Sequence, residues 1–110
     1  MNEVHFEGVI VSVDKPAAAD KNNHLVYQLR MTHRDRKGQL KQELFTVNAW
    51  NRLADWAENN IGPGIPVFVK GYLTQRSHGG VTATEITASR FVILQTMPRA
   101  EEAPAILSNG

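Results

Sequence analysis

Four histidines and a pair of acids are the residues of this 110-residue chain that could support catalysis or hold a metal. The histidines stand at positions 5, 24, 33 and 78, and no two have the H-x-x-x-H spacing that places two imidazoles on one metal. His5, on the polar face of a strand, and His24, in a loop, are both interpreted as solvated side chains. Asp55 and Glu58 lie three residues apart, which is typical of neighbours on a solvated helix face. Since the chain also has no cysteine and no G-x-S-x-G motif, the sequence predicts no enzyme, no cofactor, no metal and no small-molecule substrate.

Trp50 and two groups of cations are the residues that could bind a ligand instead. A flat indole can stack on any nucleic-acid base, at about 1 to 3 kcal/mol per base, although a tryptophan at a strand end equally fits packing on a helix. Cations neutralise phosphates and release counterions, which provides sequence-independent affinity. One group is Arg34, Arg36, Lys37 and Lys41 around one turn. In the other, along one strand, the cations Lys70 and Arg76 alternate with the rings of Tyr72 and His78. The first group also fits a solvated turn and the second a protected strand edge.

These residues need elements to position them, and the sequence predicts five strands and one short helix. Alternation of apolar and polar residues predicts strands over residues 4–13, 25–32, 40–50, 66–76 and 81–94. Asn51 is the predicted N-cap of a helix over residues 52–60, in which Trp56 is expected to be buried. Gly71 is expected to allow a sharp bend in the fourth strand, with Leu73 facing the core.

The order of these elements predicts an all-β fold. Three strands, a helix and two further strands match the five-stranded OB-fold, a Greek-key barrel with its helix between the third and fourth strands. The domain is expected to span residues 3–95, and the tail over residues 96–110 has no periodicity and is predicted to be disordered. An OB barrel offers the face of its second and third strands to oligonucleotides. Alternation places on that face Gln28, Arg30, Thr32, Leu44, Thr46, Asn48 and Trp50.

The composition of the chain gives information on the class of protein but little on its ligand. Lys and Arg (12) barely exceed Asp and Glu (11), so the net charge of +1 neither favours nor excludes a nucleic acid. The start of the chain has no leader pattern, and no apolar run approaches the roughly 18 residues of a membrane span. We therefore expect a cytoplasmic protein that does not contact membranes. Phe68 and Tyr72, both facing outward on one strand, suggest a contact between subunits.

Four segments together resemble the bacterial single-stranded DNA-binding protein family. They are the opening MNEV with Gly8, VNAWNRLADWAENN, VFVKGYLTQR and TEI, which follow in the family's order and cover most of the chain. The resemblance implies an OB-fold that forms homodimers or homotetramers and binds single-stranded DNA in replication, recombination or repair. It also implies that Trp50 stacks on a base, and that Arg76 contacts the DNA backbone.

The chain also departs from the family's pattern. Leu44 and His78 stand at or near places where well-known members have stacking tryptophans, and the last hairpin is short, so a smaller footprint or weaker binding is expected. The tail lacks the family's acidic tip, which argues against recruiting replication proteins by that route. Two relatives of the family fit equally: an adaptor similar to primosomal replication protein N, which binds single strands and restart proteins, and a mobile-element or phage member. Because a fold does not fix a function, an OB module that contacts proteins only, or one that binds sugars or structured RNA, also remains open.

Overall fold

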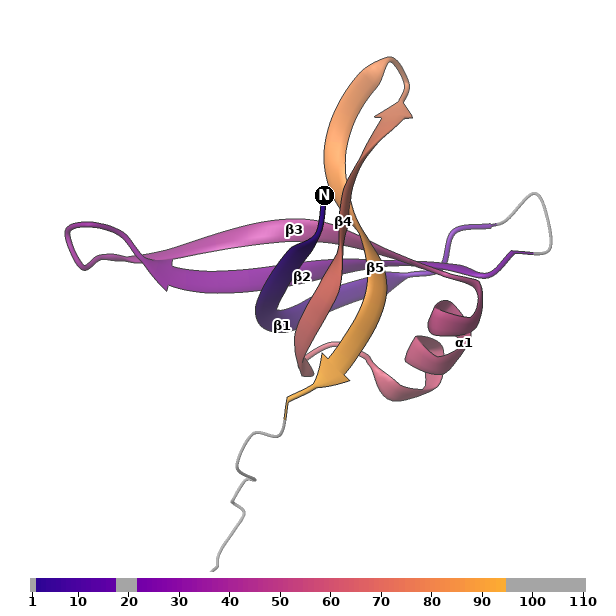
Figure 1. Cartoon of the computed structure of the whole chain (residues 1–110), viewed down its shortest axis with the longest axis horizontal. Coiled ribbons are helices and arrows are strands. Elements are labelled where there is room, and N and C mark those ends of the chain that lie inside the picture. The colour runs from indigo at the N-terminus through magenta and orange to yellow at the C-terminus, as the bar shows by residue number, and fades with distance from the viewer. Residues whose placement is uncertain (1, 18–21, 95–110) are drawn as a thin grey trace, which may run out of the picture.

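The computed structural model describes residues 2–17 and 22–94, and these form a five-stranded barrel (Figure 1). The elements are β1 (Val4–Asp14), β2 (His24–Arg34), β3 (Leu40–Trp50), α1 (Asn51–Asn60), β4 (Pro66–His78) and β5 (Val81–Ile93). The strands close in the order β1-β2-β3-β5-β4, with α1 between β3 and β4 along the chain. The predicted OB-fold is therefore confirmed. The predicted tail and the domain end at residue 95 lie outside the described residues.

The barrel core comes from the alternating apolar residues of the strands. Tyr27 and Leu29 of β2 and Val47 of β3 have no exposed surface, and Val67 and Val69 of β4 meet them from the other side. Burial of these side chains is the main favourable term in folding, at about 25 cal/mol per Å² of apolar surface. No helix in the described ranges is long and apolar enough to cross a membrane.

Two predicted core residues are exposed instead. Leu73 lies beyond Gly71, the last residue of β4 that pairs with β1, so no strand covers it on that side. Trp56 is 41% exposed because α1 packs on the barrel through Ala54 and Ala57. Trp56 precedes Ala57 by one residue, which turns its side chain about 100° around the helix and away from the barrel. Alternation did not show that the pairing with β1 ends before Leu73, whereas for Trp56 the predicted buried side of the helix was itself wrong.

The start of α1 also differs from the prediction. Trp50 is the N-cap and its side chain makes no capping hydrogen bond, whereas Asn51 is the first helical residue, with a φ of +55°. Asn tolerates this left-handed conformation better than most residues. Its backbone N–H is donated to the carbonyl oxygen of Asn23 at 2.9 Å, which ties the start of the helix to the residue before β2.

Two hairpins extend from the barrel as separate arms (Figure 1). The β2–β3 hairpin stays paired from His24↔Trp50 to Arg34↔Leu40. The β4–β5 hairpin stays paired from Val67↔Ile93 to His78↔Val81, so its turn is tight but the hairpin itself is long, and the expectation of a short hairpin was wrong. A β-bulge opposite Gly71 bends this arm, and a Cβ at Gly71 would collide with the carbonyl oxygen of Thr87.

Candidate nucleic-acid interface

The outward face of β2 and β3 is a row of cross-strand pairs. From the barrel toward the arm they are His24↔Trp50, Val26↔Asn48, Gln28↔Thr46, Arg30↔Leu44, Thr32↔Gln42 and Arg34↔Leu40. All the residues predicted on this face are found there, and His24 joins them. Side chains in directly opposite positions lie close enough to interact, so each pair acts as a unit.

Trp50 begins this row and is stacked on a histidine. The ring centroids of His24 and Trp50 are 3.7 Å apart and the planes differ by 3°. His24 is only 8% exposed, so its interpretation as a solvated loop residue was wrong. The residue belongs to β2, and the hairpin register puts it opposite Trp50. Pairing the two strands symmetrically about the turn at residues 35–39 would have revealed this from the sequence.

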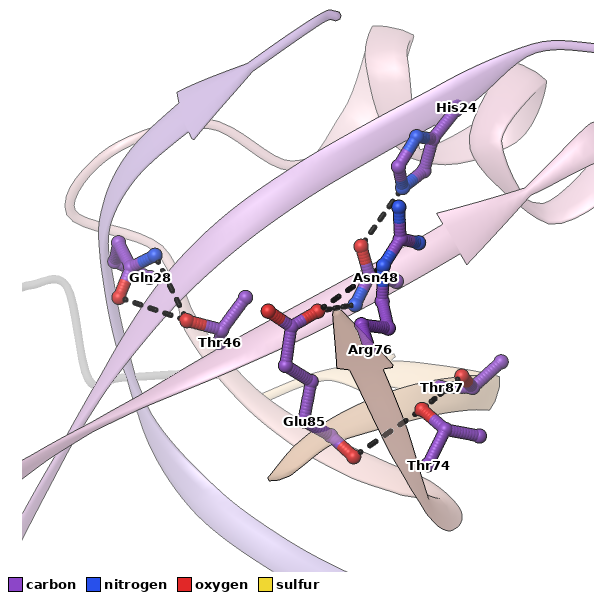
Figure 2. A network of polar contacts seen from close by, with 8 residues as sticks. All are labelled: His24, Gln28, Thr46, Asn48, Thr74, Arg76, Glu85 and Thr87. Atoms are coloured by element: carbon purple, nitrogen blue, oxygen red, sulfur yellow. Dashed lines mark hydrogen bonds and ion pairs between the residues drawn. The ribbon is translucent and has the colours of Figure 1, made fainter. Parts of the chain in front are cut away.

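A chain of hydrogen bonds runs from His24 to β5 (Figure 2). His24 Nε2 lies 2.7 Å from Asn48 Oδ1, and Asn48 Nδ2 donates to Glu85 Oε1 at 2.6 Å. An ionised carboxylate only accepts, so Asn48 must turn its amide nitrogen to Glu85 and its oxygen to His24. His24 Nε2 is therefore the protonated, donating nitrogen. Asn48 is 1% exposed although it faces outward, because β5 pairs with β3 at this position.

Arg76 closes this chain into a ring. Its Nε lies 3.7 Å from Glu85 Oε1, and its Cζ lies over the Trp50 ring at 5.7 Å from the centroid. Below it, Thr74 and Thr87 join β4 to β5 through hydroxyl oxygens 3.0 Å apart (Figure 2). The structure thus brings together two residues, Trp50 and Arg76, that the sequence identified separately. We call the set His24, Asn48, Trp50, Arg76 and Glu85 the Trp50 cluster.

The middle of the face is polar and increasingly exposed. Gln28 Nε2 donates to Thr46 Oγ1 at 3.1 Å, and both side chains are half-buried. Arg30 is exposed and forms no ion pair with any residue in the described ranges. Its cross-strand neighbour Leu44 is 62% exposed. This stretch offers one free cation and one apolar contact.

The far end of the hairpin, residues 34–41, is called the tip. Asp35 Oδ1 accepts hydrogen bonds from the backbone N–H groups of Lys37 and Gln39, both at 2.9 Å, which fixes the turn. Arg34 Nη1 donates to the carbonyl oxygen of Gly38 at 2.8 Å, and Lys41 Nζ lies 4.0 Å from Asp35 Oδ2. The two remaining cations, Arg36 and Lys37, are exposed and have no ion pair among the described residues.

The second predicted group of cations is divided. Arg76 joins the Trp50 cluster, but Lys70 Nζ pairs with Glu3 Oε2 at 3.0 Å, and this hydrogen bond lowers the pKa of Glu3. Tyr72 lines a shallow pocket of about 370 Å³ with Asn2 and Glu3. Lys70 and Tyr72 therefore lie beside the N-terminal residues. His78 ends β4, and its side chain lies outside what the structure describes.

No group of three potential metal ligands gathers anywhere in residues 2–17 and 22–94.

Comparison with known proteins relates the fold to a group of solved structures. No family model and no curated protein matches the chain. The SSB of Plasmodium falciparum in complex with ssDNA superposes with a TM-score of 0.75 and 18% identity, over 86% of this chain and 96% of that one. The single-stranded DNA binding protein of Thermus aquaticus gives 0.73 and 19%, over 86% of this chain and 50% of that one. PriB of Ralstonia solanacearum gives 0.69 and 14%, over 86% and 99%.

These likenesses define the class of fold: an OB barrel of the kind found in those proteins. The chain spans about half the length of the Thermus aquaticus protein and almost the full length of the other two.

Proposed function

We propose that this chain binds single-stranded DNA without sequence preference and catalyses nothing. It does so in the cytoplasm, as a homodimer or homotetramer, in replication, recombination or repair. Trp50 stacks on a base, while Arg76 and the cations of the β2–β3 hairpin contact phosphates. The proposal extends to Thr46 as a polar contact in the middle of the face, and to Lys70, Tyr72 and His78 as a separate contact on the β4–β5 arm.

The observation that carries the proposal is the pairing of an ordered, accessible indole with a guanidinium. Trp50 is 36% exposed although one of its faces is covered by His24, so the exposed part is available to a ligand. Arg76 lies over the same ring. A ring that stacks a base beside a cation that binds the adjacent phosphate is the arrangement by which single-stranded nucleic acids are held without sequence readout.

The remainder of the face continues from this cluster. Arg30 belongs to the next pair of this face after Gln28↔Thr46 on the way to the tip, and Arg36 and Lys37 are exposed at the end of the hairpin. A strand of DNA that stacks on Trp50 and follows β2 and β3 meets these cations in succession. The fold likeness to an SSB in complex with ssDNA supports the same reading.

A fluorescence titration tests the proposal. Because Trp56 is also exposed, the protein is first made Trp56→Phe so that Trp50 alone emits. Oligo(dT) is expected to quench this emission saturably, and Arg76→Ala is expected to reduce the slope of log K against log salt by about 0.7 to 1. Arg90→Ala, an exposed arginine of β5 outside the face, is the matched control and should leave the slope unchanged. The absence of both quenching and salt-dependent binding would overturn the proposal.

A second candidate is an adaptor that binds single strands and also a partner protein. It is favoured by the large apolar side chains that the two arms expose, among them Leu40 and Val81. Light scattering of Leu40→Ser and Val81→Ser variants separates the uses of this surface. Loss of self-association assigns these side chains to subunit contacts, whereas unchanged association together with unchanged DNA binding favours an adaptor surface.

A further inference from the structure

The stacked pair of His24 and Trp50 has a geometry that loose packing does not produce. Aromatic pairs usually prefer offset or tilted arrangements, and those elsewhere in the described chain are tilted or edge-on. His24 and Trp50 are instead parallel to within 3° at 3.7 Å, the arrangement of two stacked bases. The imidazole thus occupies one face of the indole as a base would.

Hydrogen bonds fix the orientation of the His24 imidazole. His24 Nε2–H donates to Asn48, and Asn48 is held by Glu85 on the neighbouring strand. Both His24 and Asn48 are buried, so these hydrogen bonds compete little with water. Three strands, β2, β3 and β5, therefore determine the plane of the His24 ring, and that plane determines the plane of Trp50.

We propose that His24 is a positioning residue: it covers one face of the Trp50 ring and holds that ring in one orientation. The inference rests on the proposed function, since it concerns how Trp50 meets a base. A ring held in place before binding loses little rotamer freedom on binding, which raises affinity without adding a contact to DNA.

Two substitutions at one position separate the ring of His24 from its hydrogen bond. His24→Phe keeps a flat ring and removes the donor to Asn48, whereas His24→Gln keeps a donor and removes the ring. Both are made in the Trp56→Phe background, in which Trp50 is the only tryptophan. Urea unfolding of each variant confirms that the protein is folded under the conditions of the binding assay.

The ring is expected to decide the binding. His24→Phe should bind oligo(dT) within about twofold of the parent, and His24→Gln should bind about threefold to tenfold more weakly, from the freedom that Trp50 regains. The salt slope should be the same in both variants because no phosphate contact changes. Equal affinity of His24→Gln and the parent, or a weaker affinity of His24→Phe than of His24→Gln, would overturn the inference.

A measurement without DNA keeps this test apart from that of the proposed function. The fluorescence anisotropy of Trp50 in the free protein should fall in His24→Gln and stay at the parent value in His24→Phe. If oligo(dT) does not bind but the anisotropy changes in this way, the proposed function fails while His24 still holds the ring. If the anisotropy is equal in all three proteins, the positioning role is wrong whatever binds.

Discussion

The two ends of the β2–β3 hairpin face the same way but are built differently. At the barrel end, the Trp50 cluster holds each side chain by at least two neighbours, and two of its members are buried. At the tip, the backbone is fixed by Asp35, while Arg36 and Lys37 extend into solvent. The side chains at the barrel end are therefore held in place but carry little net charge. The cations at the tip are charged, but their side chains are not held.

The difference indicates that the two ends of this face contribute to DNA binding in different ways. A held ring gives short-range affinity, because its orientation is fixed before a base arrives. Free cations act over about a Debye length, roughly 10 Å at 0.1 M salt, and need no fixed geometry to neutralise a phosphate. Removal of the Trp50 ring or of its support should therefore alter affinity at all salt concentrations, whereas removal of a cation, at the tip or at Arg76, should alter the salt dependence.

The largest effect is expected from Trp50→Ala. Loss of one stacking platform should weaken oligo(dT) binding by about fivefold to 150-fold, from about 1 to 3 kcal/mol per stacked base. Anisotropy of a labelled oligonucleotide measures this without relying on the removed fluorophore. Trp56→Ala is the matched control, since it removes an equally exposed indole from α1. Similar losses in the two variants would place the binding elsewhere.

The next effect is expected from removing charge at the tip. In the double variant Arg36→Ala and Lys37→Ala, the slope of log K against log salt should fall by about 0.7 to 1 for each lost phosphate contact. The urea midpoint should not move, because both side chains are exposed and have no ion pair among the described residues. An unchanged slope would show that the DNA does not reach the tip.

A smaller effect of opposite sign is expected from Glu85→Gln. Glu85 pairs with Arg76 and places a negative charge within the Trp50 cluster, so it competes with a phosphate for the guanidinium. Its amide analogue should bind oligo(dT) about twofold to fivefold more tightly, which is the scale of a partly exposed ion pair. Glu43→Gln is the control, because Glu43 pairs with His33 on the other face of the hairpin. Weaker binding by Glu85→Gln would mean that Glu85 chiefly supports the cluster.

The smallest effect on binding is expected from Tyr27→Phe, which changes the core beneath the face. Tyr27 donates to the carbonyl oxygen of Ile61 at 3.2 Å, so its loss should lower the free energy of unfolding by about 1 kcal/mol and leave DNA affinity unchanged. If Tyr27→Phe is fully folded under the assay conditions and still binds DNA more weakly, the core residue affects the outward face of β2 and β3.

The same tyrosine gives the stability a dependence on alkaline pH. Burial, with a smaller contribution from the charge of Glu58, raises the pKa of Tyr27 to about 12 from its ordinary 10.0. The folded state thus favours the neutral phenol, and this stabilisation is complete below pH 10 and is lost as the pH rises to 12. The free energy of unfolding, measured with urea at several pH values across this window, should decline less steeply in Tyr27→Phe than in the parent. Tyr72→Phe, which changes an exposed ring, should follow the parent.

Much of the fold was predictable because strand periodicity is a local property. The predicted strand over residues 40–50 coincides with β3, and the other four agree within about two residues at each end. The order of strands and helix then left few barrels to choose from. The error at Leu73 arose because exposure there depends on where the pairing with β1 ends, and the error at Trp56 because the predicted buried side of the helix was wrong.

The amino-acid sequence alone predicts the five strands, the outward face of the β2–β3 hairpin and the residue types on it, since alternation depends only on the backbone of each strand. Which of these residues contact one another depends on how the strands are arranged in the barrel. Arg76 reaches Trp50 because β5 lies between β3 and β4 in the barrel, and Lys70, on the same strand, pairs with Glu3. His24 became part of the site because the hairpin register places it opposite Trp50. Register and strand order are long-range properties, and no local pattern in a single strand contains them.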